Sequence, residues 1–391
     1  MLETEVAVVG GGIIGTSIAY FLAKEGKKVV LLERDHLACE ASGACDGLIM
    51  LQTKSPGVQL DLAIKSVKMF DELAGELDYP IEYQRRGGMI VVERDEELET
   101  MRRFVHSRRQ AGLDVDILGN EEARRLEPAL SSHIAGATYC SSEGQVNPIY
   151  MTFAFAMAAK KLGARICTGT EVLSIGMDDG RIRSVSTNLS DVKTDLVVNA
   201  AGAYAPLIGL MAGMTIPIEP RRGQLVVTER SPPLIGRGLL DARYILSKSS
   251  SDTPSAGADT IDRLSGGLAL EQTATGNVII GSTREFVGYN KETTPDGITA
   301  IVKHSTRIVP RLKTLCAIRA FAGLRPYTPD KLPIIDLLDR PEGFLIAAGH
   351  EGDGIALAPI TGKIVAESIL AGKVDASLQA LRLHRFKEDD Q

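Results

Sequence analysis

The stretch Val6–Gly15, with the sequence VAVVGGGIIG, decides the fold of this 391-residue chain. Four apolar residues lead into a G-x-G-x-x-G pattern, which opens a helix-forming segment that ends near Lys24. Gly10 permits a tight turn, Gly12 lets the backbone approach a pyrophosphate, and Gly15 allows close packing of helix on strand. The stretch therefore predicts a strand, a turn and a helix whose N-terminus receives phosphate.

A second strand is predicted from Lys28 to Leu32, and Glu33 ends it 18 residues after Gly15. A carboxylate at this place can accept hydrogen bonds from ribose hydroxyls. It would repel a 2′-phosphate, which favours FAD or NAD over NADP. A glycine-rich turn without a ligand is the alternative.

Composition excludes several classes of protein. The chain is 44% apolar and 24% charged and has 39 glycines and 17 prolines, which excludes a collagen-like or broadly disordered chain. Its net charge of −6 leaves no general positive field, so nucleic acid is not expected as a partner.

The cysteines and the apolar runs predict a reducing compartment, and we expect the cytoplasm. The five cysteines are scattered without a C-x-x-C pair, which argues against disulfides, a zinc site or an iron–sulfur cluster, and no metal is expected. The N-terminus lacks the pattern of a signal peptide. The apolar run Pro206–Ile218 has only 13 residues, too few for a transmembrane segment.

Periodicity along the chain predicts an α/β protein of α+β two-domain type. Residues 1–80, 140–212 and 325–391 are assigned to a Rossmann-like dinucleotide domain, and 81–139 and 213–324 to a second domain with a mostly antiparallel sheet. Ser249–Thr260 is hydrophilic and is predicted as an exposed loop. The other predicted helices are 57–77, 96–110, 120–126, 147–162 and 355–370, and the other predicted strands are 88–92, 165–168, 171–176, 181–187, 195–198 and 343–348.

Two more strands run into small residues. The first ends at Ala200-Ala201-Gly202, and the second, Phe344–Ala348, leads through Gly349–Gly354 into a helix. Both endings let a ligand lie against bare backbone, although the first is by itself also a common strand-to-turn sequence of α/β proteins. The second points a helix N-terminus at developing negative charge. Three such places favour a long cofactor such as FAD over a single NAD.

Taken in order, these motifs resemble the FAD-dependent D-amino-acid oxidase superfamily, in its branch of glycine oxidase, sarcosine oxidase β-subunit, opine oxidase and hydrogen cyanide synthase. The resemblance covers almost the whole chain. It implies a Rossmann-like FAD domain, a substrate domain over the flavin and oxidation of a carbon–nitrogen bond. The stretches that carry it are 8–15, 32–34, 198–203, 220–224, 322–326, 349–354 and 358–359.

The resemblance also implies roles for single residues. Arg325, in Gly-Leu-Arg-Pro, falls on the position that pairs with the substrate carboxylate, and a guanidinium fork suits that task. Tyr244 matches an aromatic position of the substrate site, with a packed strand tyrosine as the alternative. His350 is expected to orient groups near the flavin rather than to act as the base. The residues assigned to non-covalent FAD are Gly10, Gly12, Ile13, Ile14, Gly15, Glu33, Arg34, Ser42, Gly43, Ala44, Cys45, Val172, Ala200, Ala201, Gly202, Gly323, Arg325, His350, Glu351, Gly352, Asp353, Gly354 and Ile355.

The loop Ser42–Gly47 departs from the family pattern. It stands where a small-residue loop passes the flavin ring, but Cys45 and Asp46 replace residues that are often small and neutral in relatives. Cys45 either approaches the ring or packs as a small apolar side chain, and packing is favoured.

These expectations favour an FAD-dependent enzyme that oxidises an amino acid or an N-substituted amino acid to an imine. We expect a dehydrogenase component of a larger oligomer that passes electrons to a partner subunit. The alternatives are a stand-alone oxidase, a non-catalytic flavin-binding subunit and an FAD-linked hydroxy-acid dehydrogenase.

Overall fold

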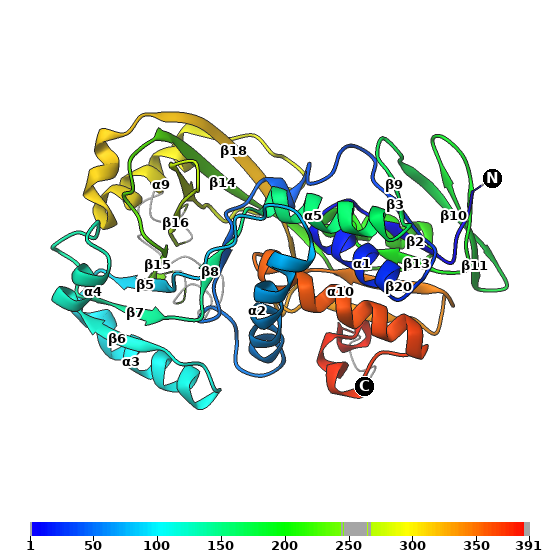
Figure 1. The fold of residues 1–391 in the computed structure, drawn as a ribbon, viewed down its shortest axis with the longest axis horizontal. Helices are drawn as coiled ribbons and strands as arrows, with labels where there is room; N and C mark the ends of the chain where they lie inside the picture. Colours follow the sequence, from blue (N-terminus) through cyan, green and yellow to red (C-terminus); the bar gives the residue numbers. More distant parts are fainter. Residues whose placement is uncertain (1, 244, 246–263, 265–266, 387–391) are drawn as a thin grey trace.

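The chain folds around two large β-sheets that lie at opposite ends of the molecule (Figure 1). A computed structural model describes residues 2–243, 245, 264 and 267–386. The predicted loop Ser249–Thr260 and the candidate substrate residue Tyr244 lie outside these residues.

The first sheet has six strands in the order β19-β20-β13-β2-β3-β9. All neighbours are parallel except β19 and β20. Along β2, Val6 and Val8 enter one core cluster while Ala7 and Val9 enter another. Burial on both faces explains why this strand is continuously apolar. The bounds are β2 Val6–Val9, β3 Val29–Leu32, β9 Arg165–Cys167, β13 Val197–Asn199, β19 Ile334–Leu337 and β20 Phe344–Ala348.

Helices α1 (Ile13–Lys24), α5 (Pro148–Lys161) and α10 (Gly354–Ala371) cover one face of this sheet, and α2 (Val58–Glu76) packs on α10. Among the described helices, only α10 is long and apolar enough to cross a membrane, and 61% of it is buried inside the protein. Its apolar composition is accounted for by this packing against α1 and α2.

The other face of the first sheet is covered by a four-stranded sheet and by α6 (Ala205–Met211). The four strands are β1 Leu2–Glu3, β12 Val192–Lys193, β11 Arg181–Thr187 and β10 Val172–Asp178. The result is a three-layer domain of helices, sheet and sheet.

The second large sheet has eight strands in the order β18-β14-β17-β16-β15-β5-β7-β6. Only β15 and β5 pair in parallel, which confirms the predicted, mostly antiparallel second sheet. The bounds are β5 Gly88–Val92, β6 Asp116–Gly119, β7 Gly136–Cys140, β14 Glu219–Arg230, β15 Gly238–Asp241, β16 Ala269–Gln272, β17 Asn277–Gly281 and β18 Ala317–Tyr327. A short pair, β4 (Leu48–Ile49) with β8 (Gly144–Gln145), lies between the two large sheets.

Helices α3 (Asp95–Gln110), α4 (Asn120–Leu126) and α9 (Pro295–Ile308) pack on the second sheet. The first two match the predicted helices, whereas α9 was not predicted. The strands of the second sheet come from residues 88–140 and 219–327, between the segments that build the first. The domain boundaries at residues 80, 139, 212 and 324 stay predictions.

Candidate active site

A long cavity lies between the carboxyl end of the first sheet and the strands β14 and β18 of the second. It contains about 1650 Å³ of empty space, its open mouth included. The cavity thus opens where ligands bind in parallel α/β sheets. Its lining includes these predicted FAD residues: Gly10, Gly12, Ile13, Ile14, Glu33, Arg34, Ser42, Ala44, Cys45, Val172, Ala200, Ala201, Gly202, Gly323, Arg325, His350, Glu351, Gly352, Gly354 and Ile355.

The glycine-rich turn forms one end of the cavity. Gly10 has φ +115°, and a Cβ added there would lie 2.5 Å from the carbonyl oxygen of Ala200. The backbone N–H of Ile13 donates to Ser42 Oγ at 2.9 Å. The glycine turn and the first residues of α1 line the cavity together, as a phosphate site requires.

Gly15 and Gly43 do not line the cavity and instead permit close packing. A Cβ at Gly15 would lie 1.9 Å from the carbonyl oxygen of Gly10, and one at Gly43 would lie 2.1 Å from that of Ala38. Gly15 therefore lets α1 pack closely on the turn that follows β2, as the motif predicts. Gly43 permits close packing within its own loop.

Glu33 lies at the end of β3 and is 8% exposed. Its Oε2 accepts from the N–H of Gly11 at 2.6 Å, and its Oε1 accepts from the N–H of Asp35 at 2.9 Å. These two bonds fix the carboxylate at the cavity wall, where the sequence predicts a ribose contact.

An aromatic stack at the same end was not predicted. The guanidinium of Arg34 lies 3.9 Å from the ring centre of Tyr204, which stacks on Tyr289 at 4.9 Å. Tyr204 lines the cavity. Its position follows Gly202 by two residues, but the sequence carries no periodicity that separates it from a packed tyrosine.

His350 lies in the turn before α10 and is 3% exposed. Its Nε2 lies 3.1 Å from Thr361 Oγ1, and burial lowers its pKa to about 4. The imidazole is therefore neutral at pH 7 and its Nε2 is occupied by a hydroxyl. This arrangement suits an orienting role better than that of a general base.

Asp353, three residues further on, is held away from the cavity lining. Its carboxylate forms a buried ion pair with Lys54 at 2.6 Å and accepts from Gln59 Nε2 at 2.7 Å. Lys54 and Gln59 lie just before and at the start of α2. The predicted FAD residue Asp353 thus joins the turn to α2, and its side chain faces these two partners.

Arg325 projects from β18 into the other end of the cavity. It donates to Ser282 Oγ at 2.5 Å and to the carbonyl oxygen of Thr283 at 3.2 Å. A Cβ at Gly223 would lie 2.3 Å from Arg325 Nη1, so a side chain at that point of β14 would displace the guanidinium. Among the described residues no carboxylate forms an ion pair with Arg325, and its charge faces the cavity.

Cys45 and Asp46 line the cavity beside Arg325. Burial, reinforced by the charge of Asp46, raises the pKa of the Cys45 thiol well above its ordinary value, so the thiol is neutral. Burial also raises the pKa of Asp46, although Arg325 opposes this shift. Asp46 was absent from the predicted site. Relatives often have a small neutral residue at this position, and the charged Asp46 in its place was the signal that could have identified it.

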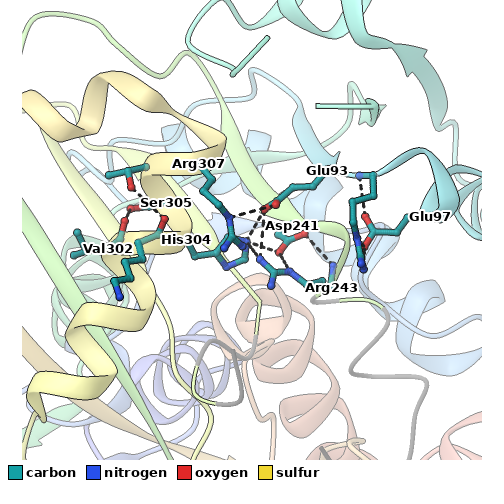
Figure 2. Close-up of polar contacts among 11 residues, drawn as sticks. Glu93, Glu97, Asp241, Arg243, Val302, His304, Ser305 and Arg307 are labelled. Atoms are coloured by element: carbon teal, nitrogen blue, oxygen red, sulfur yellow. Dashed lines mark hydrogen bonds and ion pairs between the residues drawn. The ribbon is translucent and has the colours of Figure 1, made fainter. Parts of the chain in front are cut away.

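A second polar cluster lies outside the cavity, at the ends of the parallel strands β5 and β15 (Figure 2). His304 Nε2, from α9, lies 2.7 Å from Asp241 Oδ2 and 3.1 Å from Glu93 Oε1. These three residues are close enough to share a metal ion. However, Arg243 contacts all three, and Arg307 pairs with Glu93 at 3.4 Å. Two guanidiniums balance the two carboxylates, so we assign an ion-pair network rather than a cation site.

Comparison with known proteins identifies the family. Residues 5–368 match the model of the FAD dependent oxidoreductase family. The chain belongs to this family. The oxidoreductase is 29% identical to hydrogen cyanide synthase subunit HcnC of Pseudomonas aeruginosa, over 92% of this chain and 91% of that one. It is 28% identical to the glycine oxidase of Geobacillus kaustophilus, with 93% and 92% covered. These relatives confirm the branch that the motifs indicated.

One relative and one solved structure bear on the substrate. The chain is 30% identical to the glycerol 3-phosphate dehydrogenase of Caloramator mitchellensis, over 91% of this chain and 71% of that one. The crystal structure of L-proline dehydrogenase from P. horikoshii superimposes with a TM-score of 0.88 at 29% identity, with 98% of each chain covered. The chain is therefore similar both to proteins named for the oxidation of amino acids and to one named for the oxidation of a phosphorylated alcohol.

The cavity fits FAD, the cofactor of the family. A pyrophosphate can approach the bare backbone of Gly10 and Gly12 at the start of α1. The carboxylate of Glu33, which is fixed by its hydrogen bonds, can accept from a ribose. The start of α10 faces the same cavity from the far side through Gly354 and Ile355. The lining thus offers anion-binding backbone at two places along its length, as an extended dinucleotide requires.

Proposed function

We propose that this oxidoreductase oxidises the carbon–nitrogen bond of an amino acid or an N-substituted amino acid to an imine, which water then hydrolyses. The observation that supports this proposal is Arg325. It faces the cofactor cavity with no carboxylate partner among the described residues. A guanidinium pairs bidentately with a carboxylate and stays charged at every working pH.

The surroundings of Arg325 prepare it for such a ligand. Ser282 and Thr283 accept two of its hydrogen bonds and so restrict the orientation of the fork. Gly223 and Gly323 face each other in register on β14 and β18, directly next to the arginine. A substrate carboxylate bound here would place its α-carbon inside the cavity, and such positioning lowers the barrier to reaction.

The other residues hold the cofactor and control charge. Bound FAD would supply the redox chemistry, as the acceptor of a hydride from the α-carbon of the substrate. The turn Gly349–Gly354 and the start of α10 stabilise negative charge through backbone N–H groups and the helix dipole. The neutral His350, bonded to Thr361, adds no positive charge of its own.

For the electron acceptor we propose a partner subunit rather than oxygen. HcnC is named as a subunit of hydrogen cyanide synthase, and the solved neighbour is named a dehydrogenase. Hydrogen peroxide released at the rate of turnover from the isolated chain in air would contradict this part of the proposal.

The test is an anaerobic screen of the FAD-loaded protein. Glycine, sarcosine, prolines, D-amino acids, opines and 2-hydroxy acids are added singly while the flavin absorbance is recorded. Bleaching by an amino acid that Arg325→Ala no longer shows supports the proposal. Bleaching by hydroxy acids alone would instead support an FAD-linked hydroxy-acid dehydrogenase, which would use the same arginine for the substrate carboxylate. Bleaching by no compound would support a non-catalytic flavin subunit.

A further inference from the structure

We propose that Asp46 binds the amino nitrogen of the substrate and takes a proton from it, with Glu271 as the buried carboxyl group that supports Asp46. The inference rests on the proposed function, since it concerns the nitrogen of the substrate whose carboxylate binds Arg325. In this step an N–H bond of the ammonium breaks and an O–H bond forms on Asp46. The nitrogen loses its positive charge, the carboxylate loses its negative charge, and the amine lone pair becomes available.

Asp46 and Arg325 lie at the same end of the cavity. Both side chains line the same end of the cavity, one from the loop before β4 and the other from β18. The charge of Arg325 lowers the pKa of Asp46, and no ion pair within 4.0 Å joins the two described side chains. Two opposite charges that face one cavity without contact match the ammonium and carboxylate of a zwitterion.

Asp46 is fixed in its place by the backbone. Its Oδ1 accepts from the N–H of Leu48 at 3.3 Å, which leaves the carboxylate half-buried at the cavity wall. A half-buried carboxylate without an ion-pair partner has lost part of its hydration without a compensating charge. A cationic ligand would remove that cost, whereas a neutral hydroxyl group would not.

Glu271, on β16, lies behind this loop and is 3% exposed. Its Oε1 accepts from the N–H of Gly47 at 3.0 Å, while its buried Oε2 has no hydrogen-bond partner among the described residues. Burial and the nearby charge of Asp46 raise the pKa of Glu271 to about 8. Burial and mutual repulsion therefore favour a pair that keeps one proton and carries one negative charge rather than two.

The other charged groups near Asp46 do not neutralise it. Lys54 is engaged by Asp353 in its own ion pair at 2.6 Å, and Cys45 is a neutral thiol. Arg325 is the remaining cation that acts on Asp46. Arg325 would pair with the carboxylate of a bound substrate. The ammonium of the same molecule would then be the cation that pairs with Asp46.

The experiment compares each amine with a ligand in which oxygen replaces the nitrogen. Sarcosine is paired with methoxyacetate and L-proline with tetrahydro-2-furoate. Dissociation constants are measured anaerobically on the FAD-loaded enzyme, from saturation of flavin reduction for the amines and from competition for the oxygen ligands. Asp46→Asn should weaken the amine of a pair by roughly 10- to 100-fold. Its oxygen analogue should bind equally well or more tightly, because a repulsive charge is gone.

Two further variants serve as controls. Arg325→Lys should weaken both members of a pair, since both carry a carboxylate. Glu271→Gln keeps the shape and the hydrogen-bonding capacity of the side chain and should weaken the amine by only a few-fold. Equal effects of Asp46→Asn on amine and oxygen ligand, or no effect on either, would overturn the inference and leave the proposed function standing. Where neither sarcosine nor L-proline binds the wild-type enzyme, the pair is built on whichever amino acid bleaches the flavin in the screen. Failure of every amine in that screen to bind would contradict the proposed function, and the inference would fall with it.

Discussion

Two carboxylate clusters, each with one buried member, adjoin the same eight-stranded sheet, and they are partnered in opposite ways. Asp241 and Glu93 pair with two arginines, Arg243 and Arg307, and both contact His304 (Figure 2). Beside the cavity, Asp46 and Arg325 line the wall without an ion pair between them, and Glu271 keeps an unpartnered oxygen. A compensated cluster stabilises the fold by itself. An uncompensated cluster beside a cavity is expected where a ligand completes it.

The largest effect is expected from Arg325→Ala. Loss of a charge that pairs with a bound carboxylate should lower kcat/KM roughly 100- to 1000-fold. Arg325→Lys should retain part of the activity because it keeps the charge but loses the fork. Anaerobic flavin reduction at varied substrate concentration measures both variants. The melting temperature of the holoenzyme should stay near that of the wild type, and a large fall would assign Arg325 to the fold instead.

The matching change in the compensated cluster should act on stability alone. Asp241→Asn leaves His304 and Arg243 without their buried carboxylate and should cost about 3 kcal/mol of unfolding free energy. Denaturant unfolding measures that change. Substrate binding by the folded variant should equal that of the wild type. Selective loss of binding without loss of stability would show that this network serves the active site.

The two clusters should also give stability opposite dependences on pH. Because the pKa of Glu271 is raised from 4.5 to about 8, the folded protein binds more protons than the unfolded chain in this interval. The free energy of unfolding therefore falls as pH rises from about 4.5 to about 8. Glu271→Gln should flatten this slope in melting curves recorded across that range. Burial also raises the pKa of Glu143, to about 7. Part of the pH dependence of stability should therefore remain in the Glu271→Gln variant.

Asp241 gives the opposite sign. Burial raises its pKa, but hydrogen bonding to His304 and the charge of Arg243 outweigh burial and lower it below 3.8. Its contribution to stability is present at neutral pH and is lost as pH falls through that lowered pKa. Asp241→Asn should therefore be less stable than the wild type at neutral pH, with the difference shrinking in acid. A difference that grows in acid would contradict this assignment.

The smallest effect is expected from Cys45→Ala. The thiol is neutral and contacts the carbonyl oxygen of Ser42 at 3.7 Å, so it packs against its neighbours rather than reacting. The rate of anaerobic flavin reduction should change less than about twofold. A loss of 100-fold or more would assign a chemical role to this cysteine.

Local patterns predicted the first half of the site. The strand VAVV, the glycine turn and α1 are adjacent in sequence, so their geometry follows from short-range chemistry. The glycine-rich turn before α10 is equally local. Helix α9 could have been predicted as well, because Thr294 caps it and Pro295 occupies its first turn.

The substrate end depends on contacts that sequence spacing does not encode. Asp46 and Glu271 are 225 positions apart and meet only because β16 lies behind the loop that precedes β4. Gly223 and Gly323 lie opposite each other because of the register of two long strands. Such register is set by packing across the whole sheet, which no local pattern reveals.

The central claim is that the uncompensated end of the cavity receives an amino acid rather than a hydroxy acid. The most direct test is an anaerobic titration of the FAD-loaded wild-type enzyme with matched pairs, such as glycine with glycolate and L-alanine or D-alanine with the corresponding lactate. We predict that the amine of at least one pair bleaches the flavin and that its hydroxy counterpart does not. Bleaching by the hydroxy acids with no response to any amine would contradict the account.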